Sequence, residues 1–462
     1  MAATHSRPVE DPGSEPTRSR SDRCSGRFKC LLASIWPKLN GLAVALVISS
    51  GIVAMWKPQA AVAQSSTNGS VIATGAEVLV RSGFAALDGK RVGLITNQTG
   101  RVGDRHLVDL LAEAGNVRLT AIFAPEHGFR GSVEAGEKVA DRIDKKTGIQ
   151  VHSLYGATRK PTPAMLRDLD VLVFDIQDIG VRFYTYISTM GLAMQAAAAQ
   201  GIPFLVLDRP NPLGGRYVSG FVLNSRYISF VGQYPIPIVH GLTVGELALM
   251  IKGEAWLPGL DGLDLIIGKM EGWRRDMRWH DLGREWVATS PNIPSYGSAL
   301  LYPGIGIVGE TAVNEGRGTD EPFTRFGAPW LDADAMADQL MSLGLPGVRF
   351  EAMVYTPRSI AGVATNPRYL NERVNAVRVI VTDAGAVTPL EIGIQALSLL
   401  VVEARRAGVG TFFPKRRMFQ LIAGDRRLYN QLTAEWSGSR IIAGWTGELE
   451  RFKSKRRTYL LY

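Results

Sequence analysis

The chain has 462 residues, of which 46% are hydrophobic and 21% are charged, and its formal net charge is +9. This is the composition of a globular protein with a sizeable core and two or three domains, so it excludes a disordered or low-complexity chain. The only cysteines are Cys24 and Cys30, near the N-terminus.

Residues 1–63 have the pattern of a secretory signal peptide with a long basic segment. An apolar run at residues 41–56 is followed by Ala61-Val62-Ala63, so we predict cleavage after Ala63 and a periplasmic or secreted protein. Cleavage would remove both cysteines, eight Lys or Arg and four Asp or Glu, which leaves a charge of +5 and no disulfide or Cys-metal site. The alternative is an uncleaved anchor, but this run is shorter than the roughly 20 residues that span a bilayer. A linker at residues 64–75 follows, and no later stretch resembles a membrane span.

From residue 76 onward, short apolar runs alternate with helical patterns. We predict strands at residues 91–96, 119–124, 171–175 and 203–208, and helices at residues 106–114 and 185–200. This alternation predicts right-handed βαβ units and a Rossmann-like parallel sheet in an α/β protein. The turn after the first strand, TNQTGRVG, lacks the G-x-G-x-x-G spacing of a dinucleotide site, and no Walker A sequence occurs. We therefore expect no cofactor.

Polar residues follow each predicted strand. The sequence AIFAPEHGFRG (residues 121–131) places Glu126 and His127 directly after an apolar run. The carboxyl ends of parallel strands meet at one edge of the sheet, where ligands bind. The side chains that we expect there, able to bond a polyol or a carboxylate, are Asn97, Gln98, Thr99, Glu126, His127, Arg130, Asp175, Gln177, Asp178, Arg182, Asp208, Arg209 and Asn211.

The second half of the chain begins with a Gly- and Pro-rich middle. We predict a helix at residues 244–256 and then a long loop region punctuated by residues 290–294 and 302–304. Residues 309–330 combine Glu310, Asn314, Glu315 and Arg317 with glycines, which is typical of backbone packed close to a ligand.

Residues 336–462 are predicted to form a smaller α/β domain. It would hold a strand at residues 377–381 and helices within residues 390–407, 417–436 and 442–454, with the basic residues 451–457 as a solvated helix face. This domain would close over a catalytic domain of residues 76–335, with the active site in the cleft between them.

The motifs together resemble the NamZ-type exo-β-N-acetylmuramidases, a family of bacterial glycoside hydrolases formerly listed as a domain of unknown function. They are GLITNQTG (93–100), APEHGFRG (124–131), DIQDIGVRFYTY (175–186), DRPNPLGG (208–215), SPNIP (290–294), NEGRGT (314–319) with GAPW (327–330), and RTYLLY (457–462). The resemblance implies an exported enzyme that removes N-acetylmuramic acid from non-reducing ends of peptidoglycan chains or muropeptide disaccharides. It also implies a Rossmann-like domain, a smaller C-terminal domain and a cleft site in which the family's glutamate falls on Glu126. The segment PIPIVHG departs from the family's PIPHG spacing, which leaves His240 unassigned.

Glycoside hydrolysis needs a proton on the leaving oxygen and stabilisation of an oxocarbenium-like centre, usually from two carboxyl groups. We predict Glu126 as the general acid. The second group would be Asp178, then Asp175 or Glu315, unless the substrate's own 2-acetamido group is the nucleophile. Muramic acid carries a lactyl carboxylate, which guanidinium groups bind in bidentate fashion. The arginines expected to bind it are Arg182, Arg209 and Arg317.

The remaining substrate-binding candidates are Tyr184, Asn292 and Asn314, and we expect no nucleic-acid partner. Two alternatives stay open at the level of sequence. A periplasmic muropeptide- or sugar-binding protein would bind without cleaving. A metal-dependent hydrolase would use Glu126, His127, Asp175 and His240, whose spacing matches no compact metal motif.

Overall fold

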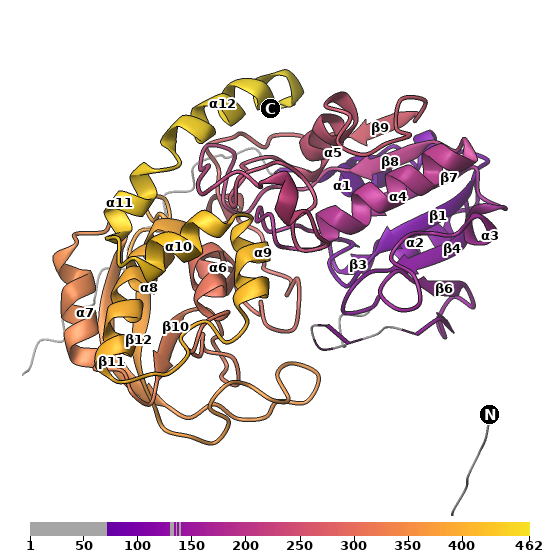
Figure 1. Ribbon diagram of the computed structural model, residues 1–462. Coiled ribbons are helices and arrows are strands. Elements are labelled where there is room, and N and C mark those ends of the chain that lie inside the picture. The colour runs from indigo at the N-terminus through magenta and orange to yellow at the C-terminus, as the bar shows by residue number, and fades with distance from the viewer. Residues whose placement is uncertain (1–71, 130–133, 135, 138–139) are drawn as a thin grey trace, which may run out of the picture. The chain divides into compact units, whose positions relative to one another are not determined.

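A seven-stranded sheet forms the first half of the computed structural model (Figure 1). Its order is β5-β6-β4-β1-β7-β8-β9, and all neighbours are parallel except the antiparallel pair β5 and β6. Its strands are β1 (Arg91–Thr96), β4 (Arg118–Ala124), β5 (Arg142–Ile143), β6 (Gln150–Ser153), β7 (Val171–Asp175), β8 (Phe204–Leu207) and β9 (Leu265–Gly268). The central strands are almost continuously buried because both faces of the sheet are covered. The predicted Rossmann-like layer is confirmed.

Helices cover both faces of this sheet. On one face α1 (Gly75–Arg81) and α2 (Leu107–Glu113) share a hydrophobic cluster with β1 and β4. On the other face α4 (Tyr186–Gln200) and α5 (Val244–Gly253) pack on β7 and β8, and the short helix α3 (Pro163–Leu166) precedes β7. A two-stranded ribbon, β2 (Arg101–Val102) and β3 (Arg105–His106), lies between β1 and α2.

The chain reverses direction across the sheet between β1 and β7. From β1 the chain passes through α2 to β4 on one side, whereas from β7 it passes through α4 to β8 on the other side. In open α/β sheets, ligands bind outside the carboxyl ends of the strands at this kind of reversal. The fold therefore places the segments after β1, β4 and β7 where a site is expected.

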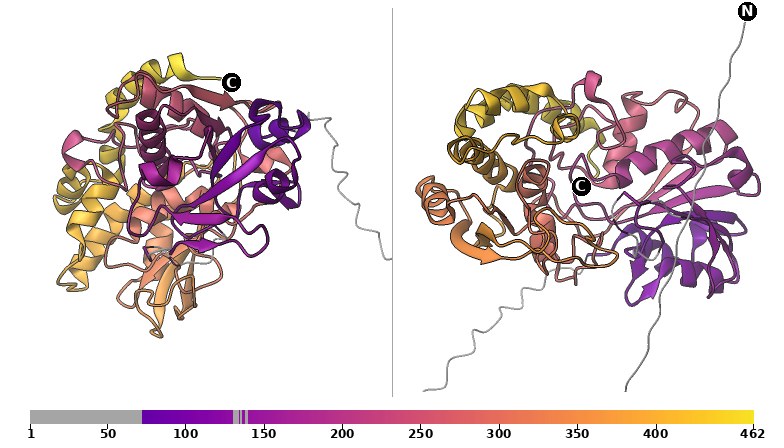
Figure 2. Two further views of the ribbon diagram at one scale, coloured as in Figure 1. Left: turned by 90° about the vertical axis from the view of Figure 1, so that its right-hand side faces the viewer. Right: turned by 60° about the horizontal axis from the view of Figure 1, so that its bottom comes forward.

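A second, smaller part contains an antiparallel sheet of order β10-β12-β11. Its elements are β10 (Arg325–Ala328), α7 (Ala333–Ser342), β11 (Val348–Tyr355), β12 (Val374–Val381), α8 (Pro389–Arg406), α9 (Arg416–Ala423), α10 (Arg426–Thr433), α11 (Gly438–Ala443) and α12 (Thr446–Arg456). One hydrophobic cluster runs from the α4 and α5 face of the large sheet into this part, so the two parts share a core. In Figures 1 and 2 the yellow helices α11 and α12 run from the small sheet towards α5. The division predicted at residue 335 stays a prediction.

The loop predicted around residues 302–304 is wrong, because these residues lie within helix α6 (Tyr296–Val308), with Pro303 inside it. A proline in a helix costs about 3 kcal/mol or more, but α6 is buried along most of its length and crosses α8 closely. At the crossing, a Cβ on Gly304 would lie 2.9 Å from the backbone nitrogen of Gly393. Burial against α8 outweighs the local preference against a helix.

The C-terminal helices also differ in detail from the expectation. Residues 417–436 divide into α9 and α10 at Gly424, which has a φ of +75°. The basic segment at residues 451–457 is not wholly solvated, because Arg456 is buried. Its guanidinium is held by backbone carbonyls, a partner that a charge pattern in the sequence does not reveal.

The structure describes residues 72–129, 134, 136–137 and 140–462. The predicted signal peptide, both cysteines and Arg130 lie outside these residues. Within them, no helix combines the length and the hydropathy that a membrane span requires.

Candidate active site

The segments after β1 and β7 are tied together by their own polar side chains. The Thr99 hydroxyl donates to Asn97 Oδ1 at 2.6 Å and accepts the backbone N–H of Gln177 at 2.9 Å. The Gln177 amide donates to the carbonyls of Asp178 and Pro210, both at 2.7 Å. These predicted site residues therefore gather at one sheet edge, where they bond to each other and shape the loops.

Asp175 and Arg209 form a buried bidentate ion pair. Arg209 Nε and Nη2 lie 2.6 and 3.0 Å from the two carboxylate oxygens of Asp175, and both side chains are almost fully buried. The pair fixes the end of β7 to the segment after β8. The predicted roles of Asp175 in catalysis and of Arg209 in binding the lactyl carboxylate do not fit this arrangement, because each group already satisfies the other.

Asp208 and Asn211 also have structural partners. The carboxylate of Asp208 accepts hydrogen bonds from the N–H of Gly245, the Thr243 hydroxyl and the Tyr462 hydroxyl, at 2.8, 2.8 and 2.9 Å. Asn211 donates to the carbonyl of Leu242 and accepts from the N–H of Leu213. These side chains join the start of α5, the C-terminus and the turn after β8. We assign them to the scaffold and not to substrate.

Arg182 is the largest fully buried side chain in the described residues. Its two terminal nitrogens donate to four backbone carbonyls, those of Phe221 (2.7 Å), Ile236 (2.8 Å), Ile422 (3.0 Å) and Ala423 (2.7 Å). The first two belong to loops of the large part and the last two to α9. Binding of the lactyl carboxylate, as expected from the sequence, does not fit this burial, and Arg182 instead joins the two parts.

Asp178 and His240 form a buried polar contact. His240 Nε2 lies 3.9 Å from Asp178 Oδ2, and Asp178 also accepts the N–H of Gly180 at 2.7 Å. Burial raises the pKa of Asp178 to about 7. Burial and nearby arginines lower the pKa of His240 to about 3, so the imidazole is neutral. Asp178 Oδ1 and His240 Nε2 are buried with no hydrogen-bond partner in the described structure.

Glu126 lies after β4, at the start of α4. The Thr185 hydroxyl donates to Glu126 Oε2 at 2.6 Å, and the N–H of Gly136 donates to Oε1 at 3.0 Å. Thr185 stands at the N-cap position of α4, with no capping bond from its side chain, so Glu126 lies near the amino end of this helix. Burial, together with the charge of Glu126 and a hydrogen bond to it, raises the pKa of Tyr155 to about 12. Neighbouring His127 is buried with a φ of +69°, which turns the chain sharply after Glu126.

An aromatic cluster connects Glu126 to the smaller part. The Tyr184 hydroxyl donates to Thr289 Oγ1 at 2.8 Å, and its ring lies 6.0 Å from that of Tyr302 on α6. The charges on Glu126 and on Glu315 both raise the pKa of Tyr302 beyond the effect of burial, and that of Arg317 lowers it. The rings of Tyr302 and Phe323 lie 4.7 Å apart, and Arg317 lies over the Phe323 ring, so the aromatic cluster extends to Arg317.

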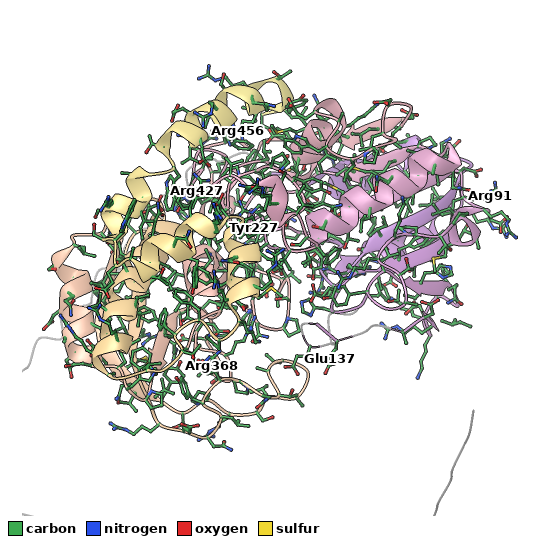
Figure 3. The ribbon with its side chains drawn as sticks, in the orientation of Figure 1. Arg91, Glu137, Tyr227, Arg368, Arg427 and Arg456 are labelled. Atoms are coloured by element: carbon green, nitrogen blue, oxygen red, sulfur yellow. The ribbon has the colours of Figure 1, made fainter. Side chains whose placement is uncertain are left out.

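A cavity of about 540 Å³ lies beside this cluster. Its charged and amide lining residues are three of the predicted site residues, Asn292, Glu315 and Arg317, with Glu134, Asn366, Arg368, Glu372 and Lys415. Three of their polar atoms are buried with no partner in the described structure: Glu134 Oε2, Asn292 Oδ1 and Arg317 Nε. Unsatisfied buried polar atoms are costly, and three around one cavity indicate a place for a polar ligand. Arg368 lies in the loops of the smaller part (Figure 3).

Glu315 and Arg317 contact each other in this lining. Arg317 Nη1 lies 3.2 Å from Glu315 Oε1, and the guanidinium lies 5.3 Å from the centre of the Phe323 ring. Glu315 packs against Gly309, where a Cβ would approach its carboxyl carbon to 2.6 Å. The side chain of Asn314, by contrast, bonds to backbone, because its amide donates to the carbonyls of Arg317 and Arg368.

Glu126 is not part of the cavity lining, but Glu134, a later residue of the same segment, is. Gly136 bonds to Glu126, and Glu134, two residues earlier, lines the cavity and accepts the N–H of Thr365 from the smaller part at 2.9 Å. A second cavity, of about 760 Å³, includes Thr99, Gln177 and Arg209 in its lining. Its lining shares no residue with the first cavity, and Arg209 there is already paired with Asp175.

Two family models match nearly the whole of the described chain. The N-terminal model of the exo-β-N-acetylmuramidase NamZ matches residues 92–297, and the C-terminal model matches residues 300–462. The chain belongs to the NamZ family. The resemblance found in the sequence motifs is thereby confirmed.

Known NamZ relatives support the assignment. The chain is 41% identical over 392 residues to the peptidoglycan β-N-acetylmuramidase NamZ of Bacillus subtilis (strain 168). This match covers 85% of the chain and 91% of the relative. Two crystal structures of DUF1343 family proteins from Bacteroides fragilis NCTC 9343 are also similar. They are 41% and 36% identical, with TM-scores of 0.78 and 0.67, and each match covers 85% of this chain and 99% of the other.

Sequence reasoning missed several residues of this candidate site. Thr185 and Tyr155 contact Glu126, and Glu134, Arg368 and Lys415 line the cavity. Thr185 is the first residue of the helix predicted at residues 185–200. A hydroxyl at a helix start could have marked it as a candidate. In the part of the chain that is described, no three His, Cys, Asp or Glu side chains gather as a metal site.

Proposed function

We propose that this chain is an exo-β-N-acetylmuramidase, a glycosidase that releases N-acetylmuramic acid from non-reducing ends of peptidoglycan fragments during cell-wall turnover. The observation that carries the proposal is the 41% identity over 85% of the chain to a peptidoglycan β-N-acetylmuramidase. The positioned carboxyl group of Glu126 and the polar cavity are chemically consistent with this activity. The comparisons give no support to a binding protein or a metal-dependent hydrolase.

Glu126 is the proton donor in this proposal. Thr185 and Gly136 each hold one of its two oxygens, so the carboxyl group has a fixed orientation before substrate arrives. A positioned carboxyl group that protonates the leaving oxygen contributes roughly 10²- to 10⁴-fold to such a reaction.

For the second carboxyl group we propose Glu315. Asp175 is bound to Arg209, and Asp178 is not part of the cavity lining, whereas Glu315 is. Within the cavity Glu315 could stabilise the cationic sugar or orient its 2-acetamido group. Asp178, protonated below about pH 7, would act as a buried neutral acid beside the site.

Arg317 is the group that we propose for the lactyl carboxylate. Of the three predicted arginines, Arg182 and Arg209 have all their strong partners inside the protein. Arg317 lines the cavity, where its Nη1 contacts Glu315 at 3.2 Å and its Nε has no partner among the described residues. The same lining holds Arg368 and Lys415, which together with Arg317 balance the carboxylates of Glu134, Glu315 and Glu372.

A pair of matched substrates tests this function. The purified protein should release the aglycone from an aryl β-N-acetylmuraminide faster than from the β-N-acetylglucosaminide by a factor of at least about 100, because a site built to bond a group rejects an analogue that lacks it. Arg317→Gln should erode this ratio, whereas Arg451→Gln, on the exposed side of α12, should leave it unchanged. Equal rates of the two glycosides with the unmodified protein would contradict the proposal.

We further propose export to the periplasm or beyond, supported by the basic segment, the apolar run and the Ala61-Val62-Ala63 site. N-terminal sequencing of protein recovered outside the cytoplasm should begin at residue 64. An intact leader on a cytoplasmic protein would contradict this.

A further inference from the structure

A cationic pocket of about 590 Å³ lies at the C-terminal end of the chain and shares no lining residue with the candidate active site. It is bounded by the segment around Gly215, by residues 273–276 and by the last residues of the chain. Its cations are Arg216, Arg274, Arg275, Lys453, Arg456 and Arg457, and its acidic groups are Asp276 and the terminal carboxylate of Tyr462.

The positive charges of this pocket exceed the available negative charges. Four cations have acidic partners, in the pairs Arg275–Glu246 (2.6 Å), Lys453–Glu450 (2.9 Å), Arg274–Asp276 (3.3 Å) and Arg216–Asp276 (3.9 Å). Among the described residues, Arg456 and Arg457 belong to no ion pair within 4 Å. The carboxylates of Glu246, Glu450 and Asp276 and the chain terminus together carry four negative charges, so the six cations are in excess by two.

The floor of the pocket is built from backbone and two arginines. Arg456, only 7% exposed, donates through Nη1 to the carbonyls of His240 and Gly241 at 3.0 and 2.7 Å. Arg275 donates to the same Gly241 carbonyl. A Cβ at residue 241 would lie 2.6 Å from Arg456 Nη1, and one on Gly215 would lie 2.8 Å from Arg275 Cζ. Glycine at both positions lets the guanidinium groups lie against the backbone.

Two guanidinium groups that meet at one carbonyl oxygen repel each other. Burial and the charge of Arg275 lower the pKa of Arg456 to about 10, so Arg456 remains charged at neutral pH. An anion between them would offset the repulsion. The position of Arg456, at the end of α12 where this helix meets the large part, is visible in Figure 3.

We propose that this pocket binds a phosphate group. Guanidinium donors match the oxygens of phosphate in bidentate fashion, and a phosphate monoester carries about −1.5 to −2 charges at neutral pH, which equals the excess in the pocket. The geometry thus assigns a second, phosphate-specific site to a protein whose proposed substrate is a carboxylate sugar. A free phosphate compound and a lipid headgroup share this chemistry.

Calorimetric titration of the purified full chain with inorganic phosphate, in a chloride buffer, tests the proposal. Saturable binding is expected. Arg457→Glu reverses an exposed charge of the lining and should weaken binding about tenfold or more, the equivalent of 1.4 kcal/mol. The matched control is Arg451→Glu, which changes an exposed arginine of α12 outside the lining and should bind as the parent protein does. No saturable binding by the parent protein, or equal weakening in both variants, would overturn the proposal.

The source of the phosphate is decided by a second arm. Cosedimentation with phosphatidic acid vesicles, whose headgroup is a phosphate monoester, absent with phosphatidylcholine vesicles and lost in Arg457→Glu, assigns a lipid headgroup. Phosphate binding without such cosedimentation assigns a soluble phosphate compound. Muramidase activity of Arg457→Glu should stay unchanged, since this residue lies outside the candidate active site.

Discussion

Replacement of Arg182 by methionine should destabilise the protein and not simply weaken substrate binding. The substitution keeps an unbranched apolar stem but leaves four buried carbonyls without their donor. A lost hydrogen bond with a buried partner left unsatisfied costs about 1–3 kcal/mol. Removal of the buried charge returns part of this cost, so we expect a net loss of about 3–5 kcal/mol, less than the sum over four such carbonyls.

Urea unfolding followed by circular dichroism measures this loss. Proteins of this kind have unfolding free energies of about 5–15 kcal/mol, so the variant should be much less stable or fail to fold. Arg182→Lys, which retains a charge and three donors, should lose less and keeps the test usable if the methionine variant does not fold. Arg451→Met, at an exposed position, should change stability by no more than about 0.5 kcal/mol. A methionine variant with unchanged stability and a raised KM would refute the structural role and restore the substrate role expected from the sequence.

Two further predictions concern groups at the site. Thr185→Val removes the donor to Glu126 Oε2 at 2.6 Å and should lower kcat by about tenfold with the melting temperature nearly unchanged, because a mispositioned acid protonates less efficiently; an unchanged kcat would show that this bond does not orient Glu126. Burial raises the pKa of Asp178 in the folded state to about 7, from an ordinary value of 3.8. Between these two pH values the folded state binds more protons than the unfolded state. The contribution of Asp178 to stability therefore falls as pH rises, by about 1.4 kcal/mol for each pH unit. Asp178→Asn should therefore gain stability relative to the parent protein from pH 4 to pH 7 in urea unfolding, and a constant difference across this range would contradict the buried-acid assignment.

The sheet could be predicted from the sequence because its strands are nearly continuous apolar runs with sharp polar ends. The predicted bounds of residues 91–96 and 171–175 agree with β1 and β7. Burial on both faces produces such runs, and the polar residues after them mark the carboxyl ends. Strand β6, which lies between β5 and β4, has no such run, since its four residues QVHS alternate in burial, and it was missed.

The individual roles at the site could not be predicted, because residue type does not reveal the partner. Arg182 and Arg317 both follow motifs of the kind that bind carboxylates. Only the structure shows that the first is surrounded by carbonyls and that the second faces a cavity. Glu134, Arg368 and Lys415 come from segments far apart in sequence and meet only when the chain is folded. The loop predicted at Pro303 was wrong for a similar reason, since packing of α6 on α8 overrides the preference of proline against a helix.

The most direct test of the central claim is the rate of Glu126→Gln on two substrates. Its control is Glu137→Gln, an exposed glutamate of the nearby loop (Figure 3), which should behave as the parent protein. If Glu126 protonates the leaving oxygen, the variant should lose roughly 10²-fold or more on a natural muramyl disaccharide, and much less on an aryl muramide whose leaving group needs little protonation. Equal losses on both substrates, or no loss on either, would contradict Glu126 as the acid of this muramidase.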